Sequence, residues 1–232
     1  MAQMLSKKDS AAKIKRAVRR HLRLSRRHPD GEAKVIAQRI LEPMAALERA
    51  VAAASAAADA AEDAFDDWNQ EDHLLDQQVR KLGFRCREWD ASRPGDQTLR
   101  RVFGGLSASE VTRMPRHEQP DFVVKMVVRG RELPAGHSGA ELLDDLARLA
   151  QSSRRAHRAY LDAEQRVGAA NAAVEMARLV VVRAYRDNYI DIERASGSEV
   201  ADACFPILRR SRRDIEEERE VPPDVEEASA GA

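Results

Sequence analysis

The chain has 232 residues, of which 34% are charged and only 4% are aromatic, with 11 Gly. This composition is typical of long helices and argues against a compact sheet protein. Lys plus Arg and Asp plus Glu both number 39, so no overall charge attracts the protein to nucleic acid or to a membrane. Two cysteines without a shared motif, and no signal-peptide pattern or membrane-length apolar run, predict a cytoplasmic protein.

Residues 1–29 are predicted to form a basic helix or arm, because Ile14, Val18 and Leu22 recur at helical spacing. Its cations are the candidate polyanion-binding residues: Lys13, Lys15, Arg16, Arg19, Arg20, Arg23, Arg26 and Arg27. Without interleaved aromatic residues or a helix-turn-helix spacing, any nucleic-acid binding is expected to be nonspecific. The alternatives are a solvated arm or one that docks on the acidic C-terminus, and the small apolar face argues against a membrane-surface role.

Residues 30–90 are predicted to form the first of two long helices. From Ile40 onward the apolar positions advance by steps of four and three, and Asp72 is the one exception. The series is Ile40, Met44, Leu47, Val51, Ala54, Ala58, Ala61, Phe65, Trp68, Asp72, Leu75, Val79 and Leu82. This heptad repeat predicts a coiled coil.

Residues 91–137 contain several Gly and Pro and one run rich in β-branched residues, Phe122 to Val128. We expect a small irregular tip with a short strand in this run. If that strand is exposed at an edge, it is the candidate surface for a protein partner.

Residues 138–195 are predicted to form the second long helix, in which the repeat resumes from Leu142 to Ala184 and only Ser153 interrupts it. Because the two helices have similar lengths, they are expected to run antiparallel as a hairpin. One possible register, in which facing residue numbers sum to about 228, places Trp68 beside Tyr160, and a slip of one heptad fits the sequence nearly as well. In that register Asp72 lies near Arg154, Arg155 and His157, which are its candidate charge partners.

A third helix is predicted over residues 196–220, followed by a disordered acidic tail over residues 221–232. The predicted fold is therefore all-α: a long antiparallel coiled-coil hairpin with an irregular tip that contains β structure. The N- and C-terminal helices are expected to pack at the open end of this hairpin.

Alanine occupies much of the predicted seam, so two helices alone would bury little apolar area. Apolar residues also extend beyond the seam, which indicates further helices from the chain's own ends or from a second copy. The candidate self-association residues are Leu47, Val51, Ala54, Ala58, Leu179, Val180, Val182 and Tyr185.

No nucleophile elbow, phosphate-binding loop or paired-cysteine motif is present, so we expect a protein that is not an enzyme and needs no metal or cofactor. The acidic residues from Glu62 to Asp76 are interpreted as a solvated face, and His117-Glu118 lacks the second His of a zinc motif. The first hypothesis is a scaffold that self-associates through its alanine-rich helices. In that hypothesis the basic N-terminus and the acidic C-terminus supply electrostatic contacts. The alternatives are a polyanion-binding protein and an adaptor that presents residues 91–137 to a partner.

Overall fold

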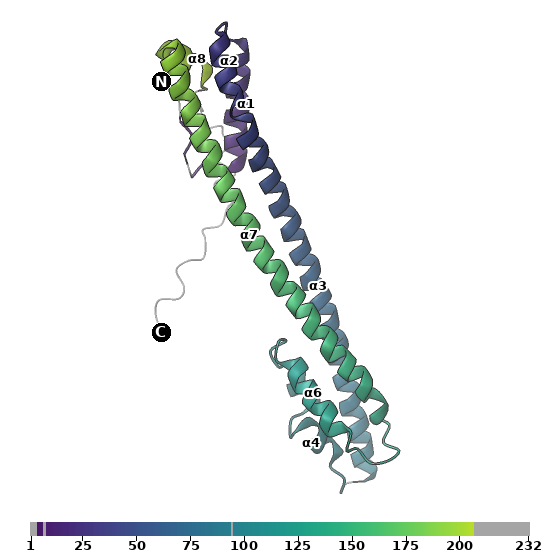
Figure 1. Cartoon of the computed structure of the whole chain (residues 1–232). Coiled ribbons are helices and arrows are strands. Elements are labelled where there is room, and N and C mark those ends of the chain that lie inside the picture. The colour runs from purple at the N-terminus through teal and green to yellow at the C-terminus, as the bar shows by residue number, and fades with distance from the viewer. Residues whose placement is uncertain (1–3, 7, 94, 207–232) are drawn as a thin grey trace, which may run out of the picture. The chain divides into compact units, whose positions relative to one another are not determined.

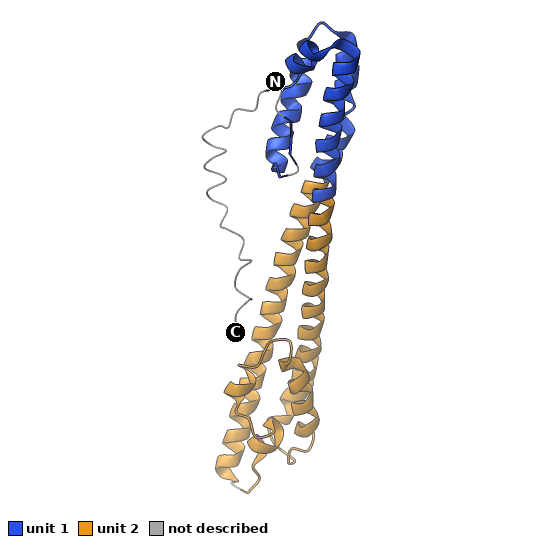
Figure 2. Cartoon of the chain, turned by 90° about the vertical axis from the view of Figure 1, so that its left-hand side faces the viewer, with its two compact units in different colours: residues 1–49, 174–232 blue, residues 50–173 orange. Residues whose placement is uncertain are grey.

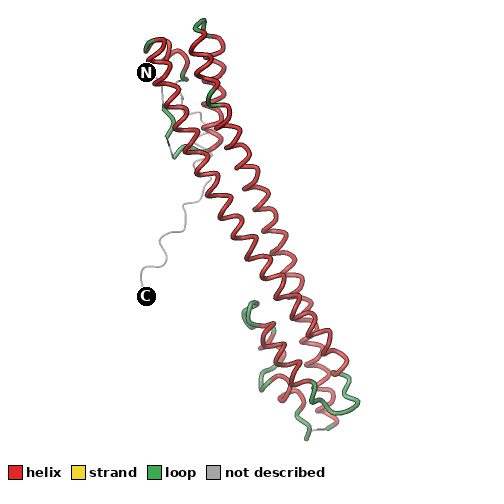
Figure 3. The backbone as a smooth tube through the Cα atoms, in the orientation of Figure 1, coloured by secondary structure: helices red, strands yellow, loops and turns green. Residues whose placement is uncertain are grey.

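The computed structural model describes residues 4–6, 8–93 and 95–206. Within these residues all regular structure is helical and no strand is present (Figure 3). The elements are α1 (Ala11–Arg27), α2 (Gly31–Gln38), α3 (Leu41–Ser92), α4 (Thr98–Phe103), α5 (Ala108–Val111), α6 (Gln119–Gly130), the 3-10 turn η1 (Ala140–Leu142), α7 (Leu143–Ser196) and α8 (Ser198–Cys204). The two long helices, α3 and α7, pack antiparallel (Figure 1). The predicted all-α fold and helical hairpin are therefore confirmed.

The start of the first long helix is divided into α2 and α3 by a break at Arg39 and Ile40. Asp30 caps α2, because its carboxylate accepts hydrogen bonds from the backbone N–H groups of Glu32 and Ala33 at 2.8 and 3.0 Å. Pro43 lies in the first turn of α3, where a missing N–H costs no hydrogen bond within the helix.

The chain forms two compact units, which Figure 2 colours separately. Unit 1 comprises residues 1–49 and 174–232, and its described part contains α1, α2, the start of α3, the end of α7, and α8. Helix α1 packs against α2 and α8. The larger core side chains of this unit are Ile14, Val18, Ile36, Ile40, Leu47, Val181, Tyr185, Ile192 and Phe205. The chain's own ends thus complete a helical bundle in unit 1, as the apolar pattern predicted.

Unit 2 comprises residues 50–173 and contains the central parts of α3 and α7 together with the short helices between them. Its core gathers where those short helices pack: Leu75, Val79, Leu82, Val102, Phe103, Val111, Val123, Met126, Leu146 and Leu149. Gly83 permits a close approach on α3, since a Cβ there would lie 2.8 Å from the Cβ of Ala108. The predicted tip is therefore a folded helical insertion.

The predicted strand from Phe122 to Val128 is wrong, because this run lies within α6. Pro120 occupies the first turn of α6, a position that favours helix initiation. The buried residues Val123, Met126, Val127 and Gly130 follow the helical spacing of three and four. Because every residue of the run except Lys125 is apolar, the β-branched residues masked this spacing, and tertiary burial decided in favour of the helix.

Candidate functional site

The candidate self-association residues do not all remain available to a partner. Leu47, Val182 and Tyr185 are buried in the core of unit 1. Val51, Leu179 and Val180 are exposed, as is Ala58, and Ala54 is half-buried. Burial by α1 and α8 therefore removes three of the eight residues from the candidate surface.

An alanine-rich stretch of unit 2 is covered by no third helix among the described residues. We define it as residues 50–64 of α3 and 159–173 of α7. The buried core around the insertion does not reach it, because that core starts at Leu75 on α3 and stops at Ala150 on α7. Within the stretch, Ala61 and Ala163 are buried, whereas Val51 and Leu161 are 40% and 46% exposed. The exposed alanines are Ala52, Ala53, Ala56, Ala58, Ala60, Ala159, Ala169, Ala172 and Ala173. Two helices close only a narrow seam here.

Unit 2 also separates its charges between the two long helices. Residues 50–79 of α3 contain eight Asp or Glu and no Lys or Arg. Residues 148–161 of α7 contain four Arg and no Asp or Glu. The basic segment covers only part of α7, because residues 159–173 contain Asp162 and Glu164 and a single cation, Arg166.

An aromatic cluster joins α3 to α7 beside the alanine-rich stretch. The rings of Trp68 and Tyr160 stack with centroids 5.6 Å apart, and Phe65 lies 5.4 Å from Tyr160. His157 stacks on Trp68 at 4.5 Å. The Trp68–Tyr160 contact agrees with the register in which residue numbers sum to about 228, and the two neighbouring ring contacts join residues whose numbers sum to 225.

The predicted charge partners of Asp72 are wrong. Its carboxylate pairs with Arg116 of the insertion, at 3.3 Å, and no ion pair joins it to Arg154, Arg155 or His157. Burial raises the pKa of Asp72, and the nearby Arg116 guanidinium opposes this effect. Arg116 lies 44 positions away in the sequence, so helical periodicity could not identify it.

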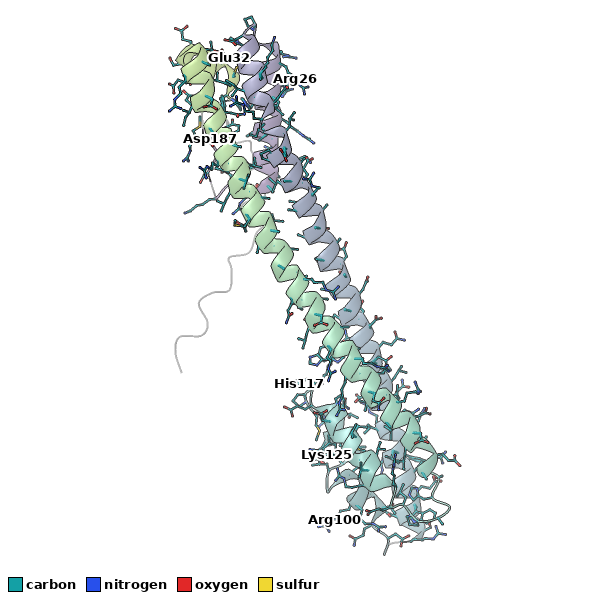
Figure 4. The ribbon with its side chains drawn as sticks, in the orientation of Figure 1. Arg26, Glu32, Arg100, His117, Lys125 and Asp187 are labelled. Carbon is teal, nitrogen blue, oxygen red and sulfur yellow. The ribbon has the colours of Figure 1, made fainter. Side chains whose placement is uncertain are left out.

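The basic residues of α1 differ in whether they form an ion pair with a described residue. Lys15 contacts Glu48 at 2.7 Å, Arg19 approaches the same carboxylate at 3.9 Å, and Lys13 pairs with Asp9. The hydrogen bond and charge of Lys15 lower the pKa of Glu48. Four exposed arginines make no ion pair with a described residue: Arg20, Arg23, Arg26 and Arg27. Figure 4 labels Arg26 on this helix, whose opposite face is buried in unit 1. The acidic tail proposed as its partner lies outside the described residues.

A buried histidine in unit 1 was not anticipated from the sequence. The Nδ1 of His21 lies 3.0 Å from the backbone oxygen of Cys204, to which it donates a hydrogen bond. The imidazole packs on Phe205 at a centroid distance of 4.0 Å. Burial lowers the pKa of His21 to about 4, although the hydrogen bond to Cys204 favours the charged form. His21 therefore joins α1 to the end of α8 as a neutral ring.

The described residues of the insertion in unit 2 present no strand edge to a partner, since α6 replaces the predicted strand. Phe84 on α3 and Val128 on α6 are exposed apolar side chains of this part of unit 2. Asp90 organises the insertion, because its carboxylate accepts hydrogen bonds from Thr98 N, Thr98 Oγ1 and Leu99 N. Burial opposes ionisation of Asp90, but these hydrogen bonds outweigh it and hold its pKa below the usual value.

Among the described residues, no group of three or more His, Cys, Asp or Glu is arranged to hold a metal ion. No helix in the described part of the chain combines the length and apolar character needed to cross a bilayer. Comparison of the chain with known protein families, with curated proteins and with solved structures finds no match.

Proposed function

We propose that this protein is a non-enzymatic scaffold whose copies associate through the alanine-rich stretch of unit 2. The observation that carries the proposal is the exposure of Val51, Leu161 and the surrounding alanines along two adjacent helices. A seam closed by Ala61 and Ala163 buries little apolar area, so at ~25 cal/mol per Å² it contributes little free energy of stabilisation. A further pair of helices on this surface would bury more.

A second copy of the chain fits this surface better than an unrelated partner, for two reasons. Alanine side chains on both helices permit close helix approach, so two identical surfaces can pack together. A symmetric dimer also covers the alanine-rich stretch of both copies at once.

The test is the molar mass of the full chain, measured by light scattering or sedimentation across a range of concentrations. We expect dimers or larger assemblies for the wild-type chain. Replacement of Ala56 and Leu161 by Glu places charges on the exposed surface without removing buried side chains, and it should shift the population to monomer. A wild-type chain that remains a monomer at every concentration would refute the proposal.

Val35→Glu is the control, because it places the same kind of charge on a 63% exposed apolar residue of α2 outside the alanine-rich stretch. This variant should assemble like the wild type. If it lost assembly as completely as the stretch variant, the alanine-rich stretch would not be the contact surface.

A second candidate function is nonspecific polyanion binding by α1, supported by its four exposed arginines without an ion pair to a described residue. Each phosphate contact steepens the salt dependence of binding. We expect Arg20, Arg23, Arg26 and Arg27 replaced together by Gln to flatten the salt dependence of binding to a DNA duplex. The control replaces four exposed arginines of the insertion, Arg100, Arg101, Arg113 and Arg131. Equal losses in the two variants, or no wild-type binding at about 50 mM salt, would exclude this function.

A further inference from the structure

A hollow of about 400 Å³ lies in unit 2 between the turn that precedes α6, the first turn of α6 and one face of α7. We call it the basic pocket. Its polar lining residues are Arg116, His117, Asp121, Arg154, His157 and Arg158. Figure 4 labels His117 in the turn before α6. The volume lies within the range of pockets that bind small molecules.

The basic pocket is assembled by helical spacing and by two anchors on α3. Arg154, His157 and Arg158 lie three and four residues apart, so they share one face of α7. The opposite wall is held to α3 by Arg116, which pairs with Asp72, and by Gln119, whose amide donates to Asp76 at 2.6 Å. The positions of both walls are therefore set without a ligand.

The charges in the basic pocket do not balance. Three arginines line it against one lining carboxylate, Asp121, which pairs with Arg154. Outside the lining, Asp72 pairs with Arg116 and Glu118 lies 3.5 Å from His117, so Arg158 is the guanidinium without a carboxylate partner among the described residues. Arg158 is exposed and makes no ion pair with a described residue. An anion in the hollow would therefore meet the guanidinium of Arg158 without competition from a carboxylate. It could also displace Asp121 from the guanidinium of Arg154.

The ring systems beside these charges supply a flat wall. His157 stacks on Trp68 with an angle of 28° between the planes, and the His117 ring lies 6.3 Å from that of His157. The N-terminus of the 12-residue helix α6 adds its positive end to the same side of the hollow. A guanidinium group can donate two parallel hydrogen bonds to two oxygens of one phosphate, and a flat ring can stack on an aromatic ligand such as a nucleobase.

The geometry points to the basic pocket as a binding site for a small ligand that carries a phosphate group. The phosphate contacts Arg158 and Arg154, and any aromatic part of the ligand lies against His157 and His117. This site is independent of assembly through the alanine-rich stretch and of the arginines on α1, so it extends the function proposed above.

The test is calorimetric titration of the full chain with inorganic phosphate and, separately, with adenosine monophosphate in a chloride buffer. We expect saturable binding of one ligand per chain. Arg158→Gln should weaken it about tenfold, since a charge-assisted hydrogen bond is lost. Arg166→Gln removes the same charge from an exposed position of α7 outside the pocket and should leave the affinity unchanged.

Asp121→Asn provides a test in the opposite direction, because it frees Arg154 and removes the one carboxylate of the pocket lining. We expect it to tighten phosphate binding several-fold. Tighter binding of the nucleotide than of phosphate identifies the ring wall as part of the site, and equal binding limits the site to the phosphate group.

Three outcomes would overturn the assignment. The first is the absence of saturable binding for both ligands. The second is equal weakening by Arg158→Gln and Arg166→Gln, which indicates only a general attraction to positive charge. The third is loss of binding when Arg26 and Arg27 are replaced by Gln, which places the anion on α1.

Discussion

Unit 1 and the alanine-rich stretch of unit 2 continue the same apolar repeat on α3 and α7, but they bury it to different degrees. Leu47 in unit 1 is 1% exposed, whereas Val51, the next position of the repeat, is 40% exposed. The difference follows from neighbouring helices, because α1 and α8 pack in unit 1 and no described helix covers the stretch in unit 2. A heptad repeat therefore predicts which side chains face a partner helix, whereas their burial depends on how many helices meet there.

Substitutions at Leu47 and Val51 test this difference in burial most directly. Leu47→Ala should lower the free energy of unfolding by about 2 to 5 kcal/mol, because it leaves a cavity in a closed core. Val51→Ala should cost less than about 1 kcal/mol, because part of the side chain already contacts water. Chemical denaturation followed by circular dichroism measures both. The comparison is made at concentrations where the chain is a monomer, and equal losses there would contradict the exposure of Val51.

The pH dependence of the free energy of unfolding tests whether His21 is buried and neutral in unit 1. The pKa of His21 falls from an ordinary 6.5 to about 4 in the folded protein. The unfolded chain therefore binds more protons between these values, and stability falls as the pH drops through this window. The shift corresponds to about 2 kcal/mol lost between pH 7 and pH 5.

The matched variant for this measurement is His21→Gln, which removes the titration and leaves the other histidines in place. Denaturation at pH 7 and pH 5 should show a smaller pH dependence in the variant than in the wild type. The buried groups around His21 do not confuse the result, because burial raises the pKa values of Tyr185 and Cys204 and keeps both neutral in this window. Identical pH dependence in the two proteins would contradict a neutral, buried His21.

The aromatic cluster of unit 2 gives the smallest expected effect. A double-mutant cycle of Trp68→Ala and Tyr160→Ala should yield a coupling energy of about 0.5 to 1.5 kcal/mol, since the rings stack across the helix pair. Trp68→Ala combined with Tyr189→Ala is the control cycle, because Tyr189 packs on Phe205 in unit 1. Coupling no larger than in the control would show that the register between α3 and α7 at this point differs in solution.

Local patterns in the sequence determined the two long helices, their antiparallel pairing and the need for further helices around Leu47 and Tyr185. Periodicity carries this information because it depends on residues only three or four positions apart. One register, in which large side chains face small ones, placed Trp68 beside Tyr160, but a slip of one heptad fitted the sequence nearly as well and the structure decided between them.

Only the tertiary structure decided which distant groups meet. The helix α6, the Asp72–Arg116 ion pair and the burial of His21 all depend on contacts between segments far apart in the chain. His21 is flanked by arginines in the sequence, which predicts an exposed position. It is buried because Phe205 and Cys204 cover it in the folded chain. The basic pocket has the same origin, because its walls come from α7 and from the turn before α6, and no repeat in the sequence links them.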